Sequence, residues 1–199
     1  MMSDYLWVER YAPKTIDDCV LPDKLKEEFE GMENIPNMLF IGDAGVGKTT
    51  VAKILCDTLN VDMMFMNASM ENGIDEVRNK IQSFASTTAL FGDYKVLLLD
   101  EADNLTADAQ KALRALIEAH QNNCRFILTC NYPHKLISPL RSRLQEYNFY
   151  YPTDGKQLKN TFIKRCIDIL SNEKVSLRKE DVATLQSLVS LSYPNWRKC

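Results

Sequence analysis

Short apolar runs alternate along this chain with longer amphipathic segments, and this alternation limits the folds that the chain can adopt. Strands connected through helices are typical of βαβ units, in which the strands lie parallel in one sheet. Apolar residues fill consecutive positions within four of the five runs, which indicates strands covered on both faces. The pattern therefore predicts an α/β fold with a five-stranded parallel sheet and helices on both faces. The predicted strands are residues 37–41, 63–66, 96–99, 126–129 and 146–149.

Helical patterns separate the predicted strands, and only helical patterns remain after the last strand. In residues 107–120, Thr106 is the predicted N-cap and a set of apolar residues at helical spacing should face the sheet: Ala109, Leu113, Leu116 and Ile117. The clearest break is the segment YPTDG at 151–155. We expect a sheet-containing domain at 1–152 and a smaller helical domain at 153–199. The predicted helices are residues 48–59, 74–87, 107–120, a short one near Pro139, 154–171 and 179–190.

Bulk composition predicts a cytoplasmic protein. The apolar runs, such as residues 96–99, are far shorter than the about 20 residues of a membrane-spanning helix, and the N-terminus lacks the pattern of a secretory signal. Six cysteines lie far apart, without zinc-site spacing, and we interpret them as reduced thiols, several of them buried. The net charge of -3 excludes a wholly basic nucleic-acid coat but allows a local basic strip.

The segment GDAGVGKT at 42–49 fits the P-loop pattern, in which a glycine-rich loop joins a strand to a helix. Its glycines let backbone N–H groups surround a triphosphate, and the following helix adds the positive end of its dipole. Lys48 should reach the β- and γ-phosphates, and the Thr49 hydroxyl should bind Mg²⁺. The predicted nucleotide-binding residues here are Gly42, Gly45, Val46, Gly47, Lys48, Thr49 and Thr50.

An acidic pair, Asp100 and Glu101, follows the apolar run 96–99, as in a Walker B arrangement. We expect Asp100 to hold Mg²⁺, directly or through water, and Glu101 to position the attacking water, because phosphoryl transfer depends mostly on alignment and charge stabilisation. A surface acidic turn is the alternative, which the P-loop upstream disfavours. Asn131 follows the fourth predicted strand, so its amide could reach the γ-phosphate, although an asparagine there is usually a turn residue.

These pieces, in this order, resemble the AAA+ clamp-loader family, which includes replication factor C small subunits and the phage clamp-loader ATPase subunit. Residues 7–18 (WVERYAPKTIDD) are similar to the family's W-x-E-K-Y-R-P-x-T-[LI]-D-[DE] segment, which covers the adenine. Ala12 replaces the family's arginine, so any contact made by that arginine is missing. The resemblance implies an AAA+ nucleotide-binding domain and an incomplete helical lid, with ATP and Mg²⁺ as cofactors. The residues implied to line the base pocket are Val8, Glu9, Arg10, Tyr11 and Val20.

The same resemblance implies catalytic elements around the acidic pair. Residues 100–103 (DEAD) are similar to the family's Walker B tetrad, and residues 110–114 resemble the helix that couples it to neighbouring subunits. Asn131 falls on the family's sensor-1 position. Residues 194–198 (PNWRK) resemble the sensor-2 box, which implies that Arg197 reaches the γ-phosphate of its own subunit.

Residues 139–144 (PLRSRL) are similar to the family's S-R-C box, with Leu144 in place of the cysteine. The resemblance makes Arg143 an arginine finger that acts in trans, inside the ATP site of an adjacent subunit. A guanidinium suits this task because it is always charged, planar and able to span two oxygens. The alternative for Arg143, and the favoured interpretation of Arg141, is a surface arginine that caps a short helix.

Members of this family place a ring-shaped sliding clamp on primer–template DNA, and their contacts go to phosphates rather than bases. Residues 73–81 are similar to the helix on the inner wall of their spiral, which implies that Arg78 and Lys80 contact DNA; a solvated helix face is nearly as good an explanation. The apolar loop 89–92 could contact the clamp or lie buried under the sheet. The implied partners are the clamp, primer–template DNA and other loader subunits in an oligomer.

Three other functions fit parts of the sequence. The DEAD tetrad suggests an RNA helicase core, but the Ser-Ala-Thr motif and second RecA-like domain of that class do not fit here. A branch-migration motor shares the AAA+ features. The chain ends at Cys199 as a third helix begins around Asn195, whereas the family continues into a collar; a fragment, half of a split gene product or a truncated ATP-binding module would end this way. The sequence of residues 194–198 favours a phage protein in its host's cytoplasm.

Overall fold

A five-stranded parallel sheet forms the centre of the protein. The computed structural model describes residues 6–70, 74–152 and 154–198. The strands lie in the order β2-β3-β4-β1-β5, and every neighbouring pair is parallel. All five predicted strands are confirmed, with each bound within two residues of the prediction. The strands are β1 (Met38–Ile41), β2 (Asp62–Asn67), β3 (Lys95–Asp100), β4 (Cys124–Cys130) and β5 (Gln145–Asn148).

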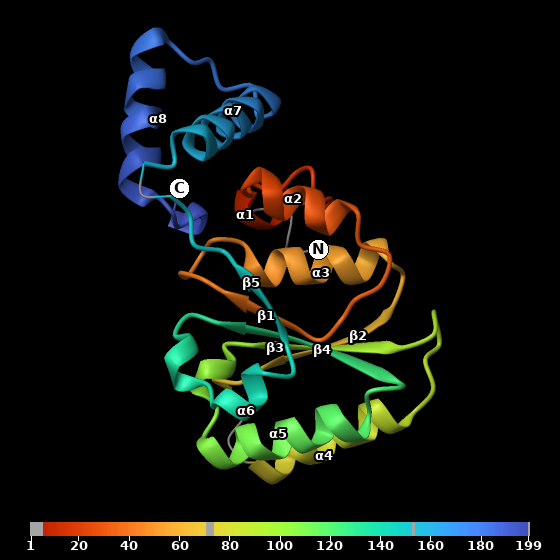
Figure 1. Ribbon diagram of the computed structural model, residues 1–199. Coiled ribbons are helices and arrows are strands. Elements are labelled where there is room, and N and C mark those ends of the chain that lie inside the picture. The colour runs from red at the N-terminus through yellow and green to blue at the C-terminus, as the bar shows by residue number, and fades with distance from the viewer. Residues whose placement is uncertain (1–5, 71–73, 153, 199) are drawn as a thin grey trace.

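Helices cover both faces of the sheet, as predicted (Figure 1). Side chains alternate along a strand, so Phe40 of β1 enters a core with the helices of one face and Leu39 enters the core of the other face. Helices α2 (Asp23–Glu30) and α3 (Lys48–Thr58) cover the first face. The second face is covered by α4 (Ile74–Ser86), α5 (Ala107–Ala119) and α6 (Ser138–Arg141), with the short turns η2 (Ala102–Asn104) and η3 (Pro133–Lys135) in the connections.

The predicted core face of α5 is confirmed, whereas two helices near the N-terminus were not predicted. The Thr106 hydroxyl accepts the backbone N–H of Ala109 at 3.3 Å, which makes it the N-cap. The four apolar residues expected to face the sheet are buried: Ala109, Leu113, Leu116 and Ile117. The unpredicted helices are α1 (Trp7–Arg10) and α2. In α2 only Leu25 and Phe29 are apolar, so the helical pattern is limited to one pair spaced four residues apart.

A buried glutamine connects α5 to the segment that precedes α6. Gln110 is only 2% exposed, and its amide nitrogen donates to the carbonyls of Leu105 and Lys135 at 3.1 and 3.0 Å. Its amide oxygen accepts the backbone N–H of Ile137 at 2.8 Å. Because a buried amide is costly to leave unpaired, these bonds hold the chain after β4 at a fixed distance from α5.

After residue 154 the described chain is helical, and it rests on the side of the sheet that carries α2 and α3 (Figure 1). The predicted helices are confirmed as α7 (Lys156–Asn172) and α8 (Lys179–Ser192). Where a third helix was expected, the described chain forms the short 3-10 helix η4 (Trp196–Lys198). Placing the domain boundary at 152/153 stays a prediction. No helix among the described residues combines the length and apolar character needed to cross a membrane.

The close contact between Gly42 and Phe149 leads to a prediction about stability. A Cβ atom at Gly42 would lie 2.8 Å from Phe149 Cβ and 2.9 Å from its carbonyl oxygen, and Phe149 is fully buried. Gly42→Ala should therefore lower the free energy of unfolding by about 1–3 kcal/mol, measured by urea denaturation. The control is Gly31→Ala, whose Cβ would meet only the Glu27 carbonyl at 3.4 Å and should change stability by less than about 0.5 kcal/mol. Equal effects of the two substitutions would contradict this explanation.

Candidate functional site

The P-loop connects β1 to α3, and its lysine lies at the start of the helix. Gly45 and Gly47 have φ angles of 81° and 98°, a left-handed conformation in which a side chain would be strained. The Lys48 ammonium donates to the carbonyls of Gly42 and Asp43, both at 2.8 Å, and to the side-chain oxygen of Asn131 at 2.9 Å. Lys48 and Asn131, which are 83 residues apart, therefore meet at one place.

Burial governs the electrostatics of this lysine. Lys48 is 7% exposed, and desolvation lowers its pKa, while nearby carboxylates such as Asp100 and Asp103 act in the opposite direction. An ammonium has three N–H donors and all three have acceptors here, so a phosphate oxygen would bind Lys48 by replacing one of them. The other two predicted P-loop residues lie in the same loop and helix: Val46 is buried and Thr50 is half-buried.

Asp100 forms the centre of a hydroxyl network at the carboxyl ends of the strands. Its Oδ1 accepts hydrogen bonds from the hydroxyls of Thr49 and Thr129, each at 2.6 Å. The Thr129 hydroxyl also accepts the backbone N–H of Glu101 at 3.0 Å. Hydroxyl and carboxylate oxygens are the hard ligands that Mg²⁺ prefers, so Thr49 and Asp100 fit the predicted metal site. Thr129 was not predicted, because a threonine inside a strand carries no local signal of this role.

Glu101 adopts a strained backbone conformation at the end of β3. Its φ and ψ angles are 57° and 42°, which is uncommon for a residue with a side chain and costs about 1–3 kcal/mol. Its carboxylate accepts hydrogen bonds from the Ser69 hydroxyl and from the Asn104 amide, the latter at 3.4 Å. Asn104 also donates to Ser69 at 2.7 Å. Ser69 and Asn104, neither of which was predicted, thus direct the Glu101 side chain toward the end of β2.

Asp103 holds the turn that carries Asn131. The Asp103 side chain is 6% exposed, and its two oxygens accept the backbone N–H groups of Asn131 and Tyr132 at 3.3 and 3.2 Å. A carboxylate that accepts two backbone N–H groups is a stronger anchor than a neutral acceptor. The position of Asn131 beside Lys48 therefore depends on the last residue of the DEAD tetrad.

The N-terminal arm, predicted to line the base pocket, lies against α7. Glu173 accepts the hydroxyl of Tyr11 at 2.6 Å and pairs with Arg10 at 2.8 Å. Val8 and Glu9 are exposed on α1. These contacts hold the arm against the C-terminal end of α7.

Tyr151 brings another predicted base-pocket residue, Val20, close to the P-loop. The Tyr151 hydroxyl lies 3.1 Å from the Val20 carbonyl and 2.8 Å from that of Val46. Burial raises the pKa of Tyr151, which keeps the hydroxyl protonated as a donor. The predicted sensor-2 segment also reaches the loop, because the backbone N–H of Trp196 donates to the Gly45 carbonyl at 3.2 Å. The adjacent Arg197 side chain is exposed.

The remaining predicted residues lie outside this cluster. Arg143 binds the carboxylate of Glu118 at the end of α5. Arg141 was interpreted as a surface arginine that caps a short helix, but it makes a two-point contact with Glu146 on β5, at 2.8 and 3.0 Å. Arg78 and Lys80 are exposed on α4, on the face of the sheet opposite α3.

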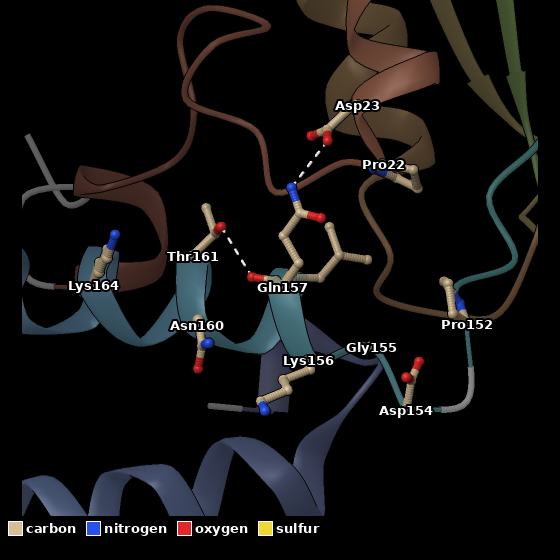
Figure 2. Close-up of a pocket in the computed structure, with 11 residues that line it drawn as sticks. Pro22, Asp23, Pro152, Asp154, Gly155, Lys156, Gln157, Asn160, Thr161 and Lys164 are labelled. Carbon is tan, nitrogen blue, oxygen red and sulfur yellow. Dashed lines mark hydrogen bonds between the residues drawn. The ribbon is translucent and has the colours of Figure 1, made fainter.

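A separate groove of about 820 Å³ lies between the start of α2, the segment after β5 and α7 (Figure 2). Its lining includes Asp23, whose carboxylate accepts the Gln157 amide at 2.9 Å. Among the described residues that line it, none is a predicted ligand of nucleotide or metal. We therefore place the candidate site at the P-loop, where the predicted residues meet.

The fold and the site define a P-loop nucleoside-triphosphate-binding protein, because a buried strand leads through the glycine-rich loop to Lys48 and a second strand delivers Asp100 beside Thr49. Residues 38–150 match the family "ATPase family associated with various cellular activities (AAA)". The chain belongs to this family.

Comparison with curated proteins gives more specific relatives. The chain is 42% identical over 208 residues to a replication factor C small subunit of Saccharolobus solfataricus, covering 99% of this chain and 60% of that protein. It is 36% identical over 203 residues to the sliding-clamp-loader large subunit of Enterobacteria phage T4, covering 98% of this chain and 63% of that protein. The chain thus spans about three fifths of the length of these relatives.

A solved structure confirms the architecture. The RuvB Holliday junction branch migration motor of Thermotoga maritima superposes with a TM-score of 0.72, covering 94% of this chain and 62% of that chain. At 22% sequence identity this likeness concerns the fold alone.

The hydroxyl network leads to a prediction about Thr129. Thr129→Val keeps the shape of this buried side chain but removes the hydroxyl between Asp100 and Glu101. Since loss of a hydrogen bond that orients a metal ligand typically weakens metal binding by about 10–100-fold, the variant should bind magnesium–ATP correspondingly more weakly in a calorimetric titration. Thr129→Ser retains the hydroxyl and should bind within about threefold of the wild type. Equal weakening by both variants would show that packing, not the hydroxyl, matters.

Proposed function

We propose that this protein is an ATP-hydrolysing subunit of a clamp loader, which opens a sliding clamp and places it on primer–template DNA in the cytoplasm. The observation that carries the proposal is the meeting of Lys48 with Asn131 and of Thr49 with Asp100 at one edge of the sheet. That cluster occurs in a chain whose relatives are named as replication factor C and sliding-clamp-loader subunits.

ATP binding is assigned to the P-loop and the elements beside it. Backbone N–H groups of residues 42–47 and the Lys48 ammonium hold the phosphates, with Thr50 at the start of α3. Thr49 and Asp100 hold Mg²⁺, which neutralises charge on the phosphates. The base lies against the arm and Val20, near Tyr151. The base-contacting arm residues are Val8, Glu9, Arg10 and Tyr11.

Hydrolysis is assigned to groups around the γ-phosphate. Glu101 orients the attacking water once its carboxylate leaves Ser69 and Asn104, and Asn131 contacts the γ-phosphate or that water. Arg197, on the segment that touches the P-loop, reaches the γ-phosphate from the lid. Arg143 lies at the surface beside Glu118 and supplies an arginine finger to the nucleotide of an adjacent subunit. The proposal therefore requires an oligomer.

Surface groups supply the contacts with DNA and clamp. Arg78 and Lys80, exposed on α4, contact the phosphates of primer–template DNA without reading its sequence. Leu90 and Phe91 are 85% and 57% exposed, so the alternative that this loop is buried under the sheet is wrong. The Asp62 carboxylate accepts the backbone N–H groups of both residues and so holds them outward. We assign this pair to the clamp contact, since exposed apolar pairs on a fixed loop suit an apolar pocket.

A branch-migration motor is the second candidate, because such a motor shares the fold. Relatives of much higher identity carry clamp-loader names, which favours the loader. Reconstitution with companion subunits, clamp and primed DNA tests the choice. A loader shows low ATPase activity alone and strong stimulation by clamp plus primed DNA. Strand displacement at a DNA junction without clamp stimulation would instead identify the motor.

Replacing Glu101 should separate ATP binding from hydrolysis. Glu101→Gln keeps the size of the side chain but cannot polarise water, so the hydrolysis rate in the reconstituted assembly should fall by at least about 100-fold. The dissociation constant for ATP, measured with a fluorescent analogue, should stay within about threefold. Glu27→Gln on the exposed side of α2 is the matched control and should hydrolyse normally. Hydrolysis that survives Glu101→Gln would remove this residue from the proposed chemistry.

Replacing Leu90 and Phe91 together by serine should abolish stimulation by the clamp. Loss of two apolar contacts at the centre of an interface is expected to weaken clamp binding by at least about 30-fold, measured by surface plasmon resonance, while unstimulated hydrolysis stays normal. Leu191→Ser is the matched control, because Leu191 is 84% exposed on α8. Normal clamp binding by the double variant would exclude this loop from the interface.

A further inference from the structure

The guanidinium of Arg143 is held from two directions by groups of its own chain. Its Nε and Nη2 atoms both bind the same oxygen of Glu118, at the end of α5. Its Nη1 atom donates to the carbonyl of Pro139 at 2.6 Å and lies 3.4 Å from the Ser142 hydroxyl. The Arg143 side chain is nevertheless 30% exposed. The group is therefore fixed in position without being covered.

The contact with Glu118 leaves part of the arginine fork available. A guanidinium has N–H groups along two edges, one formed by Nε and one terminal nitrogen and the other by both terminal nitrogens. Glu118 occupies the edge that contains Nε. On the outer edge, between the two terminal nitrogens, Nη1 already has Pro139 and Ser142 as acceptors, so among the described residues the second Nη2 hydrogen is the one left to bind a phosphate oxygen.

Stability is a poor reason for this ion pair. Glu118 is 45% exposed, and ion pairs between exposed side chains contribute little to folding. Arg141 already attaches the same segment to the sheet, because its two-point contact with Glu146 joins α6 to β5. Two arginines of one short segment thus have different partners, and only the second, Arg143, turns toward α5.

We propose that Glu118 is a positioning residue for the arginine finger: its carboxylate holds Arg143 at the subunit surface so that the remaining Nη2 hydrogen is available to a phosphate on a neighbouring chain. The inference rests on the proposed function, because it assumes that Arg143 acts in trans. Arg143 in turn keeps the pKa of Glu118 below its usual value, so the carboxylate remains charged near neutral pH. Arg114, one turn earlier on α5, contacts the same oxygen at 3.4 Å and supports its orientation.

The test uses the protein assembled with its companion subunits, clamp and primed DNA. Glu118→Ala should lower the maximal hydrolysis rate by about 10–100-fold, because small errors in position cost this much in catalysis. Glu118→Gln keeps an oxygen acceptor and should lose less. Arg143→Ala, which removes the finger itself, should cost about 1000-fold. ATP affinity, measured with a fluorescent analogue, should not change in any of the three.

The matched control is Glu146→Ala, which breaks the other arginine contact of the same segment. It should hydrolyse ATP at the wild-type rate, and thermal melting should show that all variants are folded. A normal or raised rate in Glu118→Ala, or an equal loss in Glu146→Ala, would overturn the positioning role. If Arg143→Ala also hydrolysed normally, the proposed arginine finger would fail as well; if only Arg143→Ala lost activity, the failure would concern Glu118 alone.

Discussion

The nucleotide site depends on the carboxylate of Asp100, which joins three elements of the fold. It accepts a hydroxyl from α3, through Thr49, and a hydroxyl from β4, through Thr129. Because β1, β3 and β4 run parallel, their carboxyl ends share one edge of the sheet, and the P-loop leaves β1 at that edge. Charge-assisted bonds to a half-buried carboxylate are stronger than neutral ones. The protein's own hydrogen bonds therefore fix the P-loop relative to the acidic pair.

Glu101, the residue after Asp100, has a strained backbone that is also held by hydrogen bonds at this edge of the sheet. Glu101 is held with a positive φ angle, and its backbone N–H reaches the same Thr129 hydroxyl that donates to Asp100. Its side chain, in contrast, is directed by Ser69 and Asn104. The backbone and the side chain of Glu101 are therefore held by different partners, so the side chain can move while the backbone stays in place. In the proposed reaction, the main chain keeps Asp100 and Thr129 in place while the Glu101 carboxylate changes partners.

Features with a local signal could be predicted from the sequence. Consecutive apolar residues identified four of the five strands, glycine spacing identified the P-loop, and periodicity identified the buried face of α5. Thr129, Ser69 and Tyr151 could not be found in this way, because their partners are 28, 32 and 105 residues distant and their residue types are common. Helix α2 was missed because six of its eight residues are charged, which leaves too few apolar positions to define a period.

The groups that we assign to contacts with other molecules are anchored differently from those of the interior site. Leu90 and Phe91 are exposed on a loop, and their backbone N–H groups bind the Asp62 carboxylate. The guanidinium of Arg143 is held by the carboxylate of Glu118. In both cases a carboxylate of the same chain contacts the part that faces inward and leaves the outer part exposed. An exposed side chain otherwise loses conformational entropy when it binds, which weakens the contact. Anchoring by a neighbouring carboxylate reduces that loss, so these residues can remain exposed and still bind in a defined geometry.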